Sequence, residues 1–350
     1  MICLNYKELQ IPAHFNPEAV EEVRRIDYQN IAASARTLIT QEKIRPSDKN
    51  RPGTGLLLVD CQNTFCTPGF SLFVAGRSGR GAVDDNVRIC EFIYHNLANI
   101  DEIVVSMDTH KAYQVFHSPF FVDDKGKHPD PYTEISVDDV ESGKWKVNPL
   151  LVDSAAANHK VDLQQYVLHY CKALESTGKY RLMIWPFHAM LGGVGHALVA
   201  SIEEAVFYHT IARQHQARFL VKGDNPLTEN YSVLGPEVQT DEQGHKIAHE
   251  NEKLIELLLS FDRVFIAGQA KSHCVAWTVQ DLLAEIKKCD DSLAQKIYLL
   301  EDCTSPVVVP GGQDFTEKAD EAFEKFKAAG MHLVKSTDPL SSWPGMPPGE

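Results

Sequence analysis

The segment GQAKSHCV places Cys274 between an apolar run and a stretch with helical spacing. A cysteine that opens a helix after a strand lies near the positive end of the helix dipole, which favours its thiolate form. Backbone N–H groups of the same turn have no partner inside the helix and can bind an oxyanion. The position therefore predicts a nucleophile. A small buried residue that packs the start of the helix is the alternative.

Two further ionisable residues follow apolar runs. Asp60 ends the run in LLLVDCQNTFCTPG, and Lys222 ends the run in RFLVKGDNPLTENYS. A carboxylate beside a thiol can take its proton as a general base, and an ammonium group can hold that carboxylate in place and stabilise developing negative charge. Taken singly, an Asp that caps a turn and a solvated Lys are the alternatives. Together with Cys274 they predict a catalytic triad at three strand ends.

A separate pattern, Asp108-Thr109-His110, indicates a metal site. Residues i and i+2 of a strand point to the same side, so this carboxylate and imidazole lie side by side. The pair suits a borderline divalent ion such as Zn²⁺, which needs a third ligand. His117 and His188 are candidates, and spacing does not choose between them. The alternative is that these histidines form ordinary hydrogen bonds with loops.

The elements that must position these residues alternate along the chain. Short apolar runs predict six strands, over 55–60, 102–108, 217–222, 263–268, 296–301 and 331–335. Helical patterns lie between most of them, over 84–98, 197–214, 251–260, 273–288 and 316–329. This alternation predicts a parallel sheet with helices on both faces. Ligands of such sheets bind beyond the carboxyl ends of the strands, where the candidate residues lie.

The rest of the chain is read as additions to one enzyme domain over 51–340. Residues 1–50 form an N-terminal extension, with an amphipathic helix predicted over 17–40 and a polar linker after it. Residues 111–184 are far too long for an ordinary connection and are interpreted as an insertion, with a helix near 160–175. Residues 341–350 are expected to form a loose tail.

Composition excludes several classes. The 350 residues include 34 Lys and Arg against 48 Asp and Glu, and the net charge of −14 argues against nucleic-acid partners and anionic membrane surfaces. No apolar run approaches the ~18 residues that span a bilayer. The N-terminus does not resemble a secretory signal, and the eight cysteines without CxxC pairs indicate reduced thiols in a cytoplasmic protein. Apolar helix surface predicts a homo-oligomer, and the missing GxGxxG argues against a nucleotide cofactor.

Five segments resemble, in order, the motifs of the nicotinamidase group of the isochorismatase-like cysteine hydrolases: VDCQNTFCTPG, SMDTH, WPFH, KGDNPLTENYS and GQAKSHCV. The resemblance implies a Rossmann-like, three-layer α/β/α fold with a six-stranded, mainly parallel sheet. It also implies that the catalytic residues are Asp60, Lys222 and Cys274. The implied metal ligands are Asp108, His110 and His188, with His117 as a further candidate.

The same resemblance implies details of the pocket. Members of the group place a cis peptide at the position of Gln269–Ala270, and the N–H groups of Ala270 and Cys274 would form the oxyanion hole. Phe65 and Trp185 match aromatic residues that sandwich a flat substrate ring, with core packing as the alternative. The chain departs from the group's pattern after WPFH and in the KSH that precedes Cys274, so the substrate is less constrained than the chemistry.

These observations predict a metal-assisted cysteine amidohydrolase that converts nicotinamide to nicotinate and ammonia through a Cys274 thioester. The expected cofactor is one divalent ion, Zn²⁺ with Fe or Mn as alternatives, and no nucleotide. The expected partner is a small-molecule amide, with no nucleic acid and no membrane. The alternatives are a related hydrolase of ureido, N-carbamoyl or vinyl-ether substrates and a non-catalytic binding protein on the same fold.

Overall fold

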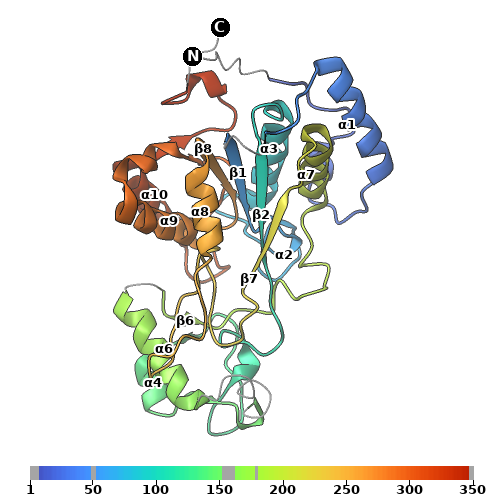
Figure 1. Ribbon diagram of the computed structural model, residues 1–350. Helices are drawn as coiled ribbons and strands as arrows, with labels where there is room; N and C mark the ends of the chain where they lie inside the picture. Colours follow the sequence, from blue (N-terminus) through green and yellow to red (C-terminus); the bar gives the residue numbers. More distant parts are fainter. Residues whose placement is uncertain (1–7, 49–52, 152–161, 178–179, 347–350) are drawn as a thin grey trace.

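Six parallel strands form one central sheet in the computed structural model, which describes residues 8–48, 53–151, 162–177 and 180–346 (Figure 1). The strands lie in the order β10-β9-β8-β1-β2-β7, and every neighbouring pair is parallel. Their bounds are β1 Thr54–Val59, β2 Glu102–Asp108, β7 Arg218–Lys222, β8 Arg263–Gly268, β9 Ile297–Leu300 and β10 His332–Val334. All six predicted strands are present, so the predicted fold class is confirmed.

Helices cover both faces of this sheet (Figure 1). One layer holds α3 (Gly81–His95) and α7 (Ala200–Arg213), with α1 (Tyr28–Glu42) packed on α7. The other holds α8 (Glu252–Ser260), α9 (Ala276–Cys289) and α10 (Thr316–Ala328). Along β1, Leu56 and Leu58 enter one hydrophobic core, while Leu57 and Val59 enter the other. A strand that is buried on both faces explains why the sequence runs are continuously apolar.

The predicted insertion forms a second lobe with its own core beyond the carboxyl ends of the strands (Figure 1). It contains α4 (Val137–Glu141), α6 (Leu163–Thr177) and two small antiparallel sheets, β3 (Phe121–Val122) with β5 (Lys146–Val147) and β4 (Glu134–Ile135) with β6 (Leu182–Met183). Large aromatic side chains fill the core of the lobe, including Phe116, Phe120, Phe121, Tyr166 and Tyr170. Leu227, from the segment after β7, joins them and ties the lobe to the sheet.

The single helix expected over 17–40 is wrong. Pro17–Ala19 form one 3-10 turn, and α1 begins only at Tyr28. Each start has its own cap, because the Asn16 side chain accepts a hydrogen bond from the Glu18 N–H (3.1 Å) and the Asp27 side chain accepts one from the Asn30 N–H (3.2 Å). The cap at Asp27 marks the start of a separate helix. The apolar spacing continues across the break between the two segments, so it predicted one helix.

The expected loose tail over 341–350 is also wrong for its described part. Trp343 is only 4 % exposed, and its ring stacks on Phe92 and on Tyr298, with ring centroids 5.8 Å apart in both pairs. The Tyr298 hydroxyl donates a hydrogen bond to the Pro344 carbonyl (2.8 Å). The tail packs on the domain because the Trp343 indole fills an apolar site between β9 and α3. Residues 347–350 lie outside the described residues.

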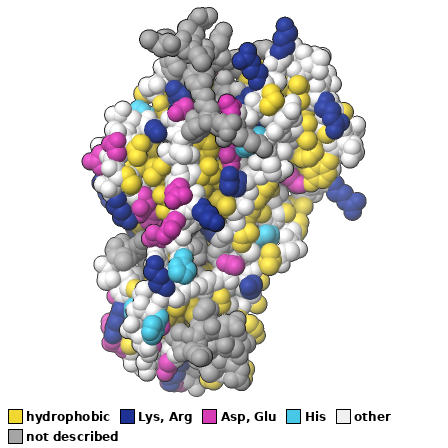
Figure 2. Space-filling model, viewed as in Figure 1, with side chains coloured by type: hydrophobic (Ala, Val, Ile, Leu, Met, Phe, Trp, Pro, Cys, Tyr) yellow, Lys and Arg dark blue, Asp and Glu magenta, His cyan; other side chains and the backbone are white. Residues whose placement is uncertain are grey.

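The surface agrees with an acidic protein of mixed charge. Figure 2 shows acidic and basic side chains interspersed over the face that it presents. Among the described helices, none is long and apolar enough to cross a membrane. The seven cysteines in the described ranges are all free, and Cys3 lies outside them. A homo-oligomer and a cytoplasmic location stay predictions.

We expect Trp343→Ala to lower the free energy of unfolding by about 3–5 kcal/mol, because it removes a buried indole and leaves a cavity against two aromatic rings. Urea denaturation followed by circular dichroism measures the change. Leu150→Ala is the control, since Leu150 is 86 % exposed and its truncation should change little. Equal stability of the two variants would show that the docked tail does not stabilise the fold.

Candidate active site

Four neighbouring strands each bring one reactive residue to the same edge of the sheet. Asp60 follows β1, Asp108 and Lys222 end β2 and β7, and Cys274 lies just after β8. The register of β2 and β7 places Asp108 directly opposite Lys222. Residues that are up to 214 positions apart (274 − 60) therefore meet in one small volume.

The ammonium group of Lys222 is the centre of this cluster. Its Nζ lies 2.9 Å from Asp60 Oδ2 and 2.9 Å from Asp108 Oδ1. It donates a further hydrogen bond to the Asn230 carbonyl (2.7 Å) and lies 3.6 Å from Cys274 Sγ. All four ionisable side chains are buried. The ammonium thus links the candidate nucleophile with two carboxylates in an environment that excludes water.

Ser106 holds the second oxygen of the Asp60 carboxylate. Its hydroxyl donates to Asp60 Oδ1 (2.5 Å), and its Oγ accepts from the Asp60 N–H (3.1 Å). Asp60 has a φ of 48°, a left-handed conformation that Asp tolerates better than most residues. The sequence prediction missed Ser106. Its signal was a polar residue inside the buried run EIVVSMD, two positions before Asp108.

The pKa values of the cluster fit a protonated thiol beside a base. Burial raises the pKa of Asp60, and the positive charge of Lys222 only partly opposes this. Burial also raises the pKa of the Cys274 thiol well above its usual value, with Lys222 again opposing. Burial lowers the pKa of Lys222, but Asp108 and Asp60 raise it by more, so it stays charged. Asp60 is the group placed to take the thiol proton.

The turn around Cys274 carries the candidate oxyanion hole. Lys271–Val275 form one π-helical turn before α9, and the peptide bond between Gln269 and Ala270 is cis. The N–H groups of Lys271 and His273 donate to backbone carbonyls. The Ala270 N–H has no backbone partner within the described part of the chain, so it is available to a ligand.

The side chain of Gln269 anchors this turn to the first helix layer. Its Nε2 donates to Asp85 Oδ2 of α3 (2.8 Å), and its Oε1 accepts from the Ser305 N–H (3.3 Å). The turn is therefore held from both sides of the sheet edge. Nothing in the sequence pattern pointed to Asp85, because it lies in an ordinary helical stretch.

Three buried histidines lie beside the Lys222 cluster. The ligating atoms of His110, His117 and His188 are all within 4.8 Å of one another. Asp108 faces two of them, with Oδ1 3.2 Å from His110 Nε2 and Oδ2 3.5 Å from His188 Nε2. The structure thus brings together all four residues predicted as metal ligands.

Hydrogen bonds to the outer ring nitrogens prepare two of these imidazoles for a metal. His117 Nδ1 lies 3.0 Å from the Lys111 carbonyl, and His188 Nδ1 lies 2.8 Å from the Pro186 carbonyl. A carbonyl only accepts, so Nδ1 carries the proton and Nε2 keeps its lone pair. His117 Nε2 and His110 Nδ1 are buried and have no hydrogen-bond partner among the described residues. Burial and His110 lower the pKa of His117 to about 4, which keeps it neutral. These residues fit a divalent ion.

A small cavity opens onto both clusters. It is lined by Cys274, Lys222, Asp108 and His188, and by the two aromatic residues that the sequence singled out, Phe65 and Trp185. Phe65 comes from the short helix α2 (Asn63–Cys66), and its ring lies edge-on to His188 at 5.7 Å. The Trp185 indole donates a hydrogen bond to the Tyr231 hydroxyl (2.9 Å).

Glu229 is a further cavity residue that the sequence prediction missed. Its side chain lines the cavity and is buried, and burial raises its pKa to about 7. Oε1 accepts from the Asn230 N–H (3.2 Å), while Oε2 is buried and has no hydrogen-bond partner in the described ranges. Glu229 lies in KGDNPLTENYS, seven residues after Lys222, where spacing alone did not single it out.

Two other cysteines near Asp60 in the sequence, Cys61 and Cys66, do not line this cavity. Cys61 and Cys66 lie in the hydrophobic core of the α3 and α7 layer, and burial raises the pKa of both thiols. Of the cysteines in the described ranges, Cys274 is the one that lines the cavity.

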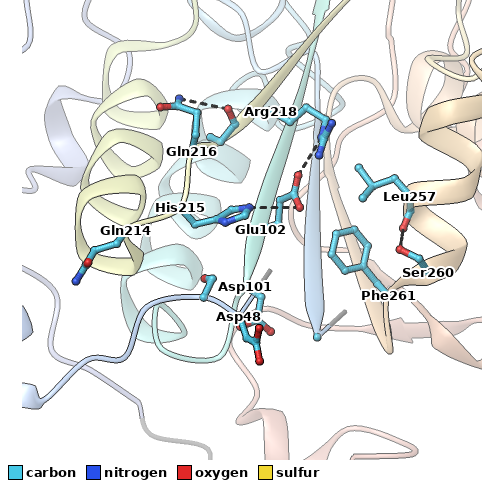
Figure 3. A pocket seen from close by; sticks show the side chains of 13 residues that line it. Asp48, Asp101, Glu102, Gln214, His215, Gln216, Arg218, Leu257, Ser260 and Phe261 are labelled. Carbon is cyan, nitrogen blue, oxygen red and sulfur yellow. Dashed lines mark hydrogen bonds and ion pairs between the residues drawn. The ribbon is translucent and has the colours of Figure 1, made fainter. Parts of the chain in front are cut away.

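A larger pocket of about 660 Å³ lies at the opposite, amino-terminal edge of the sheet (Figure 3). Its charged groups pair with one another, as Figure 3 shows for Glu102, which lies 2.9 Å from Arg218 and 3.5 Å from His215. The lining contains no cysteine, so the chemistry assigned to the thiol cannot occur there.

Comparison with solved structures finds nicotinamidases and a pyrazinamidase among similar folds. The yeast nicotinamidase bound to the inhibitor nicotinaldehyde is 20 % identical, with a TM-score of 0.49, over 81 % of this chain and 99 % of that one. The Acinetobacter baumanii enzyme is 18 % identical, with a TM-score of 0.47, over 83 % and 99 %. The Pyrococcus horikoshii pyrazinamidase in complex with zinc is 18 % identical, with a TM-score of 0.42, over 81 % and 99 %.

No protein-family profile matches the chain, and no curated protein matches it. At the identities and TM-scores of the solved structures, what the chain does has to be inferred from its own residues.

We expect the protein to bind one divalent ion, and His117→Ala and His188→Ala each to weaken that binding. Removing a group that only hydrogen-bonds to a metal ligand lowers metal affinity by about 10- to 100-fold. Each of these changes removes a ligand itself, so we expect a larger loss of affinity. Titration with Co²⁺, followed by its visible spectrum, measures the affinity. The control is His245→Ala, whose imidazole is 71 % exposed. Wild-type affinity in both cavity variants would contradict the site.

Proposed function

We propose that the protein is a metal-assisted cysteine amidohydrolase that cleaves the C–N bond of a small aromatic amide, converting nicotinamide to nicotinate and ammonia. One observation carries this proposal. Lys222 Nζ lies 2.9 Å from both Asp60 and Asp108 and 3.6 Å from Cys274 Sγ, and the cavity that these residues line also reaches His188, one of the three clustered histidines. A nucleophile, a base and a cation site thus face one ligand.

In the first half-reaction, Asp60 takes the proton of the Cys274 thiol, and the thiolate attacks the amide carbon. The N–H groups of Ala270 and Cys274 hold the oxyanion that forms. Asp60 returns the proton to the nitrogen as the C–N bond breaks and ammonia leaves, which yields a thioester on Cys274. Lys222 keeps the Asp60 carboxylate oriented and adds positive charge near the reacting atoms.

In the second half-reaction, Asp60 activates a water that attacks the thioester, which releases the acid and restores the thiol. Phe65 and Trp185 flank the flat ring of the substrate. A divalent ion held by Asp108, His110 and His188, with His117 as a further ligand, would supply a Lewis-acidic site for the ring nitrogen.

The histidine cluster favours this reaction over the two alternatives. A ureido, N-carbamoyl or vinyl-ether substrate needs no ring nitrogen on a metal, so it leaves three converging imidazoles without a role. A non-catalytic binding protein leaves the linked Asp60, Lys222 and Cys274 without a role. The same proposal names a small-molecule amide as the partner and Zn²⁺ as the metal ion, with Fe or Mn as alternatives. It also places the protein in the cytoplasm as a homo-oligomer.

We expect Cys274→Ala to lower the rate of ammonia release from nicotinamide by about 10⁴-fold or more, because it removes the nucleophile. The same variant should still bind the divalent ion, since Cys274 is not a proposed ligand. Cys289→Ala is the matched control, because Cys289 is exposed at the end of α9 and does not line the cavity. Wild-type turnover by Cys274→Ala would refute the mechanism.

We expect kcat/KM to fall at low pH, through a pKa above the ordinary carboxyl range. Asp60 must be ionised to take the thiol proton, and burial raises its pKa, so activity is present above that raised pKa and lost below it. Metal content measured at each pH separates this loss from loss of the ion. Asp60→Asn should remove this acid limb and lower the rate by about 10²–10⁴-fold. An acid limb that survives in Asp60→Asn would assign the base to another group.

A further inference from the structure

A second pocket, of about 260 Å³, lies against the Cys274 cavity. The two share three lining side chains, Trp185, Tyr231 and His273. We call the second one the outer pocket; its other lining residues are Glu134, Tyr180, Arg181, Met183, Gln313, Phe315 and Lys318. They come from the inserted lobe, from the segment that leads into α10 and, for Lys318, from the first turn of α10 itself.

His273 presents an unused hydrogen-bond donor at the boundary between the cavity and the outer pocket. Ser272 Oγ accepts from the Val307 N–H (3.0 Å) and lies 2.8 Å from His273 Nδ1. Within the described part of the chain, His273 Nδ1 is the one acceptor in reach of the Ser272 hydroxyl hydrogen, so the hydroxyl donates to Nδ1 and the ring carries its proton on Nε2. Burial lowers the pKa of His273 to about 3, so the ring is neutral. His273 is 4 % exposed, and its buried Nε2 has no hydrogen-bond partner among the residues that the structure describes.

A buried N–H without an acceptor is costly, so its natural partner is a ligand. The acceptors of nicotinamide already have assigned places in the proposed function, the carbonyl oxygen at the oxyanion hole and the ring nitrogen at the histidines. Neither of these two acceptors is assigned to the His273 Nε2–H. It therefore matches an additional acceptor on the substrate.

The outer pocket has the chemistry to receive a charged group that carries such an acceptor. Lys318 Nζ lies 5.2 Å from the ring centre of Tyr180 and 5.5 Å from that of Phe315. No salt bridge of Lys318 occurs among residues 8–48, 53–151, 162–177 and 180–346. Arg181 adds a second positive charge, which is paired with Glu175 at 3.5 Å. Glu134 is the one carboxylate among the lining residues, and because Arg181 is paired with Glu175, Lys318 is the lining cation that is left to attract an anionic group.

We propose that the preferred substrate is an aromatic amide with an additional anionic group on its ring, such as a carboxylate. An oxygen of this group accepts the His273 Nε2–H, and its charge lies near Lys318 in the outer pocket. This rests on the proposed amidohydrolase function and narrows its substrate class. His273 is then a specificity-determining residue, and Lys318 supplies long-range attraction at a partly exposed site.

The experiment compares ammonia release from nicotinamide with release from a nicotinamide that carries a ring carboxylate. We expect the carboxylate-bearing amide to have a kcat/KM about tenfold higher or more, which corresponds to one well-placed charged hydrogen bond. Lys318→Ala should raise KM for the anionic amide by about 3- to 5-fold, a change that shrinks with added salt, and leave nicotinamide unchanged. Lys325→Ala on the same helix is the matched control, because Lys325 does not line the pocket.

His273→Phe keeps a planar ring and removes the donor, so it should abolish the preference for the anionic amide, whereas His273→Asn should keep part of it. Unfolding of each variant by urea checks that its fold is intact. Equal kcat/KM for the two amides in the wild type, or no effect of Lys318→Ala and His273→Phe on their ratio, overturns this inference and leaves the amidohydrolase function standing. Failure to hydrolyse either amide, with metal bound, overturns both.

Discussion

A buried ammonium group between two buried carboxylates is the interaction on which the rest of the site depends. Removing Lys222, Asp60 and Asp108 from water costs several kcal/mol per ion, and only close pairing at 2.9 Å offsets it. Loss of one partner would leave an uncompensated charge in the interior, at a cost of about 3–5 kcal/mol. The pairing in turn requires the register of β1, β2 and β7, since a slip of one residue would turn these side chains to the wrong face.

The same ammonium joins two chemistries that the sequence presents as separate motifs. On one side it contacts Asp60, the base in the proposed function. On the other it contacts Asp108, whose second oxygen faces His188. The charge state of the nucleophile's base and that of the cation site are therefore electrostatically coupled through one side chain. Asp60 and Asp108 are similar in burial, but their pKa values are shifted in opposite directions, because Asp108 has two imidazoles beside it as well as Lys222.

The central sheet and the reactive strand ends could be predicted because both depend on local pattern. Continuous apolar runs mark strands that are buried on both faces, and the residue that ends each run must lie at the carboxyl edge. Ser106 and Glu229 escaped prediction because their role depends on what packs against them across strands. The break before Tyr28 and the docking of Trp343 escaped for the same reason. The cap at Asp27 starts a new helix, but the spacing of the apolar residues does not change there, so the sequence pattern does not reveal the break. Trp343 packs on residues that are far from it in the sequence, so its burial follows only from the folded structure.

The division between chemistry and specificity follows the division between the sheet and its additions. Asp60, Asp108, Lys222 and Cys274 come from four adjacent strands and can reach one another in any chain that builds this sheet edge. Trp185, Tyr180 and Phe315 come from the inserted lobe and from the approach to α10, and they meet only because the lobe packs over the carboxyl ends. His273 belongs to both parts. It adjoins the nucleophile in sequence, and its ring packs against Tyr180, Trp185 and Phe315. In the proposed function, the side chains that the additions place around this one imidazole would therefore contact the part of the substrate beyond its amide.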